Sequence, residues 1–161
     1  TGPGMVGYGW GAIGDEGNPE EPGLIEEMLK TFFDEVIEQY QVPSGQAILG
    51  GFSQGAGMTY RCGLGRPDLF AGLVVLSSSR ADWDELRGRL PTQRTQPIFI
   101  AHGTEDPVSP VERARIARKF LEGEGFNPQY REYDMGHEIT PEVIGDLVPW
   151  VREVLPPLFV S

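Results

Sequence analysis

The chain has 161 residues, of which 39% are hydrophobic, and it carries a formal net charge of −11 at pH 7. This length suits one domain with a sizeable core, and no apolar run approaches the ~18 residues that a membrane span needs. The acidic balance argues against nucleic acid and anionic membrane surfaces as partners. We therefore expect a single globular domain over residues 1–161.

The chain has one cysteine, Cys62, which excludes an intrachain disulfide. The cytoplasm is then the default compartment. Cys62 falls on a predicted helix, where we interpret it as a small buried side chain rather than a reactive thiol. Acidic residues gather between positions 16 and 27 with no histidine or cysteine among them, so we expect solvated carboxylates there and no metal site.

The first 23 residues are rich in glycine and proline and predict irregular structure. Farther along, apolar spacing and turn signals predict alternating helices and strands. Helices are expected at 24–40, 54–64, 82–90, 110–124 and 140–154, and strands at 46–52, 73–77, 97–101 and 129–133. This alternation suits βαβ units and predicts a parallel sheet with flanking helices.

Two of these helices have recognisable starts. Ser109 stands before Pro110, which predicts Ser109 as the N-cap and a proline in the first turn. The same order of residue types recurs at Thr140 and Pro141.

The segment Gly50–Gly57 joins a predicted strand to a predicted helix, with Ser53 at the turn. The spacing Gly51-x-Ser53-x-Gly55 fits a nucleophile elbow, in which a serine is held on a strained turn above the end of a sheet. We expect strand and helix to approach so closely that a Cβ atom at either glycine would clash. The turn would present the Ser53 hydroxyl to a base and a substrate, and the N–H of Gln54 would stabilise an oxyanion.

This short pattern also occurs by chance, and the chain has 22 glycines. The pattern alone does not separate a catalytic serine from a chance match. The predicted strand before Ser53 and the predicted helix after it favour the catalytic interpretation.

Two further polar residues follow predicted strands: Asp106 comes after strand 97–101, and His137 after strand 129–133. Ligand chemistry in such a sheet gathers beyond the carboxyl ends of the strands. The chain order Ser, Asp, His is the order of α/β-hydrolases. His137 would act as the base for Ser53, and Asp106 would accept the other ring N–H of His137.

Each of these residues has a structural alternative. Asp106 could be a turn residue before Pro107, and Glu105 is the nearest rival acid. His137 could cap the following helix. We interpret His102, the other histidine, as structural because it lies at a strand end before a glycine turn.

The segments Gly50–Gly55, His102–Val108 and Gly136–Glu138 together resemble the phospholipase/carboxylesterase family of α/β-hydrolases. This family includes bacterial carboxylesterases and acyl-protein thioesterases. Trp10, followed by an acidic loop and a long helix, is similar to the segment that precedes the family's elbow. The resemblance covers nearly the whole chain. It implies an α/β-hydrolase fold, no cofactor, and hydrolysis of esters or thioesters of acyl groups.

On this resemblance, Ser53, Asp106 and His137 form a catalytic triad, and the N–H of Gln54 is one oxyanion donor. We expect a serine carboxylesterase that acts on small or medium acyl esters through an acyl-enzyme. A thioesterase or lysophospholipase is an alternative, and so is an inactive half-domain that binds a partner.

Three residues flank the motif loops and are candidates for the walls of a substrate pocket: Trp10, Val108 and Ile139. Packing in the core or at the surface is as common a role for each of them.

Part of the family pattern is missing. Family members have strands before the segment that resembles Trp10, and one of these ends in a His-Gly loop that supplies the second oxyanion donor. Nothing in residues 1–23 looks like that strand, so we expect the amino-terminal part of the fold to be absent from this chain.

Strand 46–52 would then pair with strand 73–77 on one side and have a bare edge on the other. Its sequence has no charge and no proline to discourage pairing with other chains. We expect this edge to be covered, either by a polypeptide outside the 161 residues or by a second copy of the chain.

Overall fold

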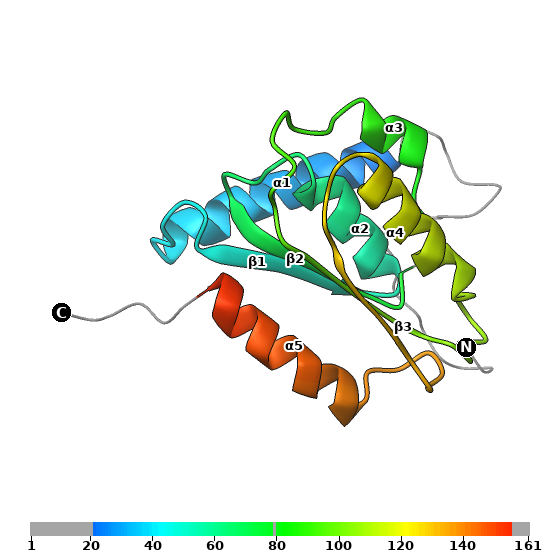
Figure 1. Cartoon of the computed structure of the whole chain (residues 1–161). Coiled ribbons are helices and arrows are strands. Elements are labelled where there is room, and N and C mark those ends of the chain that lie inside the picture. The colour runs from blue at the N-terminus through cyan, green and yellow to red at the C-terminus, as the bar shows by residue number, and fades with distance from the viewer. Residues whose placement is uncertain (1–20, 79, 156–161) are drawn as a thin grey trace, which may run out of the picture. The chain divides into compact units, whose positions relative to one another are not determined.

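A computed structural model of the chain describes residues 21–78 and 80–155 (Figure 1). The chain divides into two compact units, Thr1–Tyr40 and Gln41–Ser161, which we describe separately. None of the helices in the described ranges combines the length and hydropathy of a membrane-spanning helix.

The first unit contains helix α1, Glu21–Gln39, which begins earlier than the sequence predicts. Its apolar residues recur at the three- and four-residue spacing of an amphipathic helix. Lys30 lies 3.0 Å from Glu27 and 3.2 Å from Glu26. Hydrogen bonds to these two carboxylates raise the pKa of Lys30, and both pairs have a spacing that supports a helix.

The second unit is built on a four-stranded sheet in the order β1-β2-β3-β4, with every neighbouring pair parallel. The strands are β1 (Ala47–Phe52), β2 (Phe70–Leu76), β3 (Ile98–Gly103) and β4 (Gln129–Tyr133). The parallel sheet and the place of each strand are as predicted. β3 is buried along its whole length and β2 almost so, whereas every residue of β1 is half-buried or exposed. The continuous apolar runs of β2 and β3 therefore mark strands covered on both faces.

Four helices connect and cover these strands: α2 (Gln54–Gly63), α3 (Trp83–Arg87), α4 (Glu112–Gly123) and α5 (Pro141–Val154). α2 packs against β1 and β2, and α4 packs against β3. α5 packs on the opposite face of the sheet from α2 and α4 (Figure 1). There the ring of Trp150 lies 5.7 Å from that of Phe99 in the core.

The starts of α4 and α5 differ in how well the sequence predicts them. Thr140 caps α5 as predicted, because its hydroxyl accepts a hydrogen bond from the N–H of Val143. The prediction of Ser109 as the cap of α4 is wrong. α4 begins later, after Val111, and no side chain caps it.

Candidate active site

Ser53 occupies the turn between β1 and α2 with φ 55° and ψ −117°. A positive φ is uncommon for a residue other than glycine, and such strain costs on the order of 1–3 kcal/mol. The N–H of Ser53 donates to the carbonyl of Leu76 at 2.9 Å, which ties the turn to the end of β2. The Ser53 side chain does not cap α2. It is therefore directed to a partner elsewhere.

The close approach of β1 and α2 depends on Gly51. A Cβ atom there would overlap the backbone carbonyl of Gly55 and crowd the nitrogen of Ala56 at 2.7 Å. The prediction of a clash at Gly55 is wrong, since a Cβ atom at Gly55 would meet no described atom within 4 Å apart from its chain neighbours and the backbone of its own helix. Gly55 contributes its backbone to the contact, whereas only Gly51 needs to lack a side chain.

The structure brings Ser53, His137 and Asp106 together beyond the carboxyl ends of β1, β4 and β3. Ser53 Oγ lies 2.9 Å from His137 Nε2, and His137 Nδ1 lies 2.7 Å from Asp106 Oδ2. An ionised carboxylate only accepts, so Nδ1 carries the ring hydrogen and Nε2 accepts from the serine hydroxyl. This is the arrangement by which an imidazole takes a proton from a serine.

The ring of His137 packs against Phe52, the last residue of β1, with their centroids 4.7 Å apart. The His137 side chain is 16% exposed and that of Asp106 is 0% exposed. The imidazole of His137 is therefore reachable from solvent, while the carboxylate of Asp106 behind it is shielded from water.

The Asp106 carboxylate has a full set of hydrogen-bond donors. Its Oδ1 accepts from the N–H groups of Val108 at 2.8 Å and Ser109 at 2.7 Å. Burial acts most strongly on the pKa of Asp106 and raises it, but the bonds from Ser109, His137 and Val108 together outweigh burial and lower the pKa. The carboxylate is thus held ionised, as a partner for an imidazolium must be.

The rival acid, Glu105, is exposed, and its N–H donates to the carbonyl of Met135 at 3.2 Å. Of the two neighbouring acids, the structure places only Asp106 against His137.

The loops that carry Asp106 and His137 meet at Gly103. A Cβ atom at Gly103 would overlap the carbonyl oxygens of Met135 and Gly136. The N–H of Thr104 also donates to the carbonyl of Tyr133 at 2.8 Å, which ties β3 to β4 at this end. A glycine at this position lets the histidine loop pass close enough for the ring to reach the acid.

Sequence reasoning missed the part that Ser109 plays. Its N–H donates to Asp106, and its hydroxyl donates to the carbonyl of Ser78, which follows β2. A signal was present in the spacing Asp106-x-x-Ser109, because an aspartate often accepts from the N–H groups two and three residues later.

The structure places the remaining candidates as follows. Gln54 is the first residue of α2, so its N–H lies at the positive end of the helix dipole. Val108 and Ile139 stand two residues after Asp106 and His137 and are 63% and 42% exposed. Trp10 lies outside the described residues.

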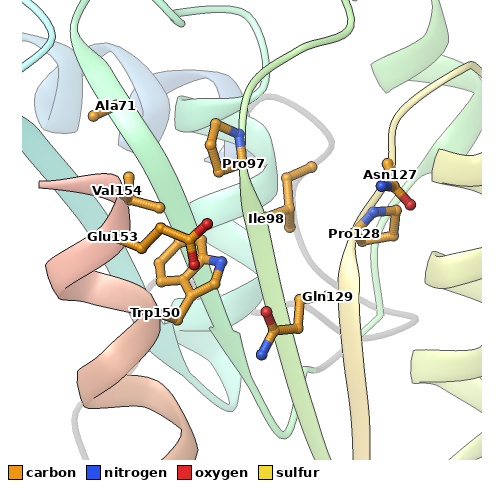
Figure 2. Close-up of a pocket in the computed structure, with 9 residues that line it drawn as sticks. All are labelled: Ala71, Pro97, Ile98, Asn127, Pro128, Gln129, Trp150, Glu153 and Val154. Atoms are coloured by element: carbon orange, nitrogen blue, oxygen red, sulfur yellow. The ribbon is translucent and has the colours of Figure 1, made fainter.

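Figure 2 shows a pocket of about 550 Å³ at the other end of the sheet. It is lined from the beginnings of β2, β3 and β4 and from Trp150, Glu153 and Val154 of α5. Since Ser53, Asp106 and His137 follow the strands' carboxyl ends, this pocket is separate from their site. In the described ranges, no group of three His, Cys, Asp or Glu side chains is placed to hold a metal ion.

A model of the phospholipase/carboxylesterase family matches residues 19–155. Acyl-protein thioesterase 1 of Gibberella zeae is 32% identical over 151 residues, covering 87% of this chain and 62% of that protein. Acyl-protein thioesterase 1 of Mycosarcoma maydis is 31% identical over 159 residues, covering 87% and 65%. The chain thus spans about three fifths of the length of these relatives.

Solved structures share the fold. The carboxylesterase of Bacillus cereus superposes with a TM-score of 0.74 at 20% identity, over 88% of this chain and 66% of that chain. Esterase PE8 superposes with a TM-score of 0.81 at 24% identity, over 92% and 71%. At these identities the likeness shows an α/β-hydrolase fold.

Proposed function

Because the chain belongs to the phospholipase/carboxylesterase family, we propose that it is a serine hydrolase that cleaves carboxylic esters of small or medium acyl groups. The observation that carries the proposal is the relay from Asp106 Oδ2 through the His137 ring to Ser53 Oγ, with both joining distances below 3.0 Å. We call the side chains of Asp106, His137 and Ser53 together the relay.

The chemistry follows from the direction of the hydrogen bonds. His137 Nε2 takes the hydroxyl proton as Ser53 Oγ forms a bond to the acyl carbon of the ester. The resulting imidazolium faces the ionised Asp106, and its Nε2–H is then given to the leaving alcohol as the carbon–oxygen bond breaks. Water, deprotonated by the same nitrogen, then cleaves the acyl-enzyme and restores Ser53.

The carbonyl oxygen of the ester gains negative charge as Ser53 Oγ bonds to the acyl carbon. The N–H of Gln54 lies where α2 begins, beside Ser53, and it is the donor that we assign to the oxyanion. The exposed side chains of Val108 and Ile139 lie in the loops of Asp106 and His137, and we assign them to contacts with the acyl group.

A second candidate is thioester hydrolysis by the same relay. It is favoured by the names of the curated relatives, which are acyl-protein thioesterases. The ratio of kcat/KM for an oxygen ester and a thioester of the same acyl group separates the two activities.

Labelling and turnover together test the proposal. A fluorophosphonate should modify Ser53, and Ser53→Ala should lower the turnover of a short p-nitrophenyl ester by several orders of magnitude. Ser44→Ala is the matched control, because Ser44 is an exposed serine whose hydroxyl bonds the carbonyl of Asp68 in another part of the unit. Labelling of another serine, or a fully active Ser53→Ala variant, would end the assignment. A folded chain with neither labelling nor turnover would favour an inactive domain that binds a partner.

A further inference from the structure

His102 is a buried histidine that the relay does not use. It lies near the end of β3 and is 0% exposed. Its Nε2 lies 2.7 Å from the carbonyl oxygen of Ser109, which only accepts, so this nitrogen carries the ring hydrogen. Its Nδ1 is also buried and has no hydrogen-bond partner in the described ranges.

Ser109 connects His102 to the acid of the relay. Its N–H donates to Asp106 Oδ1, its hydroxyl donates to the carbonyl of Ser78, and its own carbonyl accepts from His102. Ser109 is 2% exposed, so these bonds are shielded from bulk water. The backbone of Ser109 is therefore fixed by hydrogen bonds at both its N–H and its carbonyl group, and His102 makes the bond to the carbonyl.

His102 also lies close to the carboxylate itself. Its Nε2 is 3.6 Å from Asp106 Oδ2, the oxygen that faces His137. This distance is too long for a hydrogen bond. Both side chains are 0% exposed, and in such surroundings the polar N–H acts on a nearby charge with little screening.

Stability alone explains this residue poorly. A buried polar atom without a partner costs on the order of 1–3 kcal/mol, and Nδ1 is such an atom. An apolar side chain would remove that cost, although it would leave the carbonyl of Ser109 unpaired. Only a side chain with a hydrogen-bond donor at this position can make the bond that fixes the carbonyl of Ser109.

We propose that His102 is a positioning residue for the relay. It holds Ser109 so that the N–H groups after Asp106 keep the carboxylate directed at His137. This inference rests on the proposed function, and it acts through Asp106 without contact with the substrate.

Two variants of the whole chain test it. His102→Gln keeps a side-chain N–H near the place of Nε2, whereas His102→Leu removes the donor. The turnover number is measured per Ser53 that a fluorophosphonate can label, so that unfolded protein does not count. The chain has only two histidines, so in each variant the imidazole resonances in an NMR spectrum belong to His137 alone.

For His102→Leu we expect kcat to fall roughly 10- to 100-fold with little change in KM, since small displacements in a reacting geometry reach ~100-fold. The NMR resonance of the His137 Nδ1 proton should also shift, because a displaced carboxylate changes the 2.7 Å hydrogen bond between that nitrogen and Asp106. His102→Gln should recover most of both effects.

Gln96→Leu is the matched control. Gln96 is a buried polar residue before the start of β3, and it bonds the carbonyl of Phe70 at 2.9 Å. The control should lose stability without moving the resonance of the His137 Nδ1 proton.

Unchanged kcat and an unchanged resonance of the His137 Nδ1 proton in His102→Leu would overturn the inference. If His102→Leu does not fold, His102→Asn replaces it, because its shorter side chain cannot place a donor at Nε2. Equal behaviour of the Asn and Gln variants would then overturn the inference. Absence of labelling and turnover in the parent chain would reject the proposed function instead, and the NMR resonance of the His137 Nδ1 proton would still report whether His102 positions Asp106.

Discussion

Asp106 and Glu105 are neighbours in the chain, yet only Asp106 faces the ring of His137. The loop sets this choice, because the N–H groups of Val108 and Ser109 bind one carboxylate oxygen and leave the other for the histidine. The backbone donors that follow Asp106 thus orient its carboxylate toward His137.

This arrangement predicts the effect of removing the negative charge of Asp106 or that of Glu105. Asp106→Asn should lower turnover by on the order of 10³–10⁴, because the amide favours the wrong tautomer of His137. Glu105→Gln, the matched control one residue earlier, should change turnover little. Steady-state kinetics of a short ester checks both variants. The reverse order of effects would move the acid to Glu105.

The two glycines of the elbow also differ in how much space each leaves for a side chain. Gly51→Ala should destabilise the protein by about 1–3 kcal/mol, the usual cost of overpacking, because its Cβ would overlap the Gly55 backbone. Gly55→Ala places its Cβ in open space within a helix, so it should be neutral or stabilise by up to about 1 kcal/mol. Urea unfolding measures both changes, and equal losses in the two variants would contradict this view of the turn.

The sequence was sufficient to predict how Ser53, Asp106 and His137 meet, because each follows a recognisable strand of a parallel sheet. It did not predict which glycine of the elbow needs to lack a side chain, since this depends on which backbone atoms lie nearest. It also misassigned Ser109, which has the usual sequence of a helix cap but bonds to Ser78 and Asp106. Contacts between distant segments decide such cases.

At the scale of elements, α4 and β4 are joined by a paired arginine and glutamate. Arg115 of α4 donates from Nε and Nη2 to the two carboxylate oxygens of Glu132, at 2.8 and 2.7 Å. Tyr130 adds a hydrogen bond to the same carboxylate. The bonds from Arg115 are the main cause that lowers the pKa of Glu132 from 4.5 to about 2.

The lowered pKa predicts how stability depends on pH. The folded state binds the Glu132 proton more weakly than the unfolded state does. The ionised carboxylate therefore adds to the free energy of unfolding, and this contribution is complete above pH 4.5 and is lost as the pH falls toward about 2. The pair is partly exposed, with side-chain exposures of 52% and 25%, so we expect only ~0.5–1 kcal/mol. Glu132→Gln and Arg115→Gln should both remove this contribution from the free energy of unfolding measured by urea. A steeper or unchanged loss of stability with acid in both variants would contradict the assignment.

Element boundaries were predicted unequally. β4 has the bounds that the sequence predicts. β2 begins at Phe70, earlier than the sequence predicts for that strand. β2 is longer because it pairs with β1 from Ala47 onward, and cross-strand pairing is not visible in local sequence. α5 begins where its Thr-Pro signal indicates, since the cap of that helix is a local contact.

At the scale of the whole molecule, β1 is the edge of the described sheet. β1 carries the elbow, but among the described strands it pairs only with β2. Its segment Ala47-Ile48-Leu49 is apolar and only half-buried. We propose that in any stable form this edge is covered by a polypeptide outside the 161 residues or by a second copy of the chain.

Light scattering combined with an esterase assay tests that proposal. The chain alone should form species larger than 17.7 kDa, or it should need an added segment to stay in solution. Turnover without the cover should be lower by about 10²–10³, the usual cost of one missing oxyanion donor. A monodisperse 17.7 kDa monomer with full turnover would refute the proposal. It would also indicate that the glycine-rich stretch 4–14, outside the described residues, supplies the second donor.

The sheet also has a simple order: its strands stand side by side in the order in which the chain is made. On a ribosome, each new strand would find its neighbour already present, which favours folding from the amino-terminal side as synthesis proceeds. The elbow serine and the acid after β3 would take their places first, and His137 would arrive only with the segment after β4. Until that segment docks, Ser53 lacks the imidazole that we propose as its base, so we expect the nascent chain to have no hydrolase activity during synthesis.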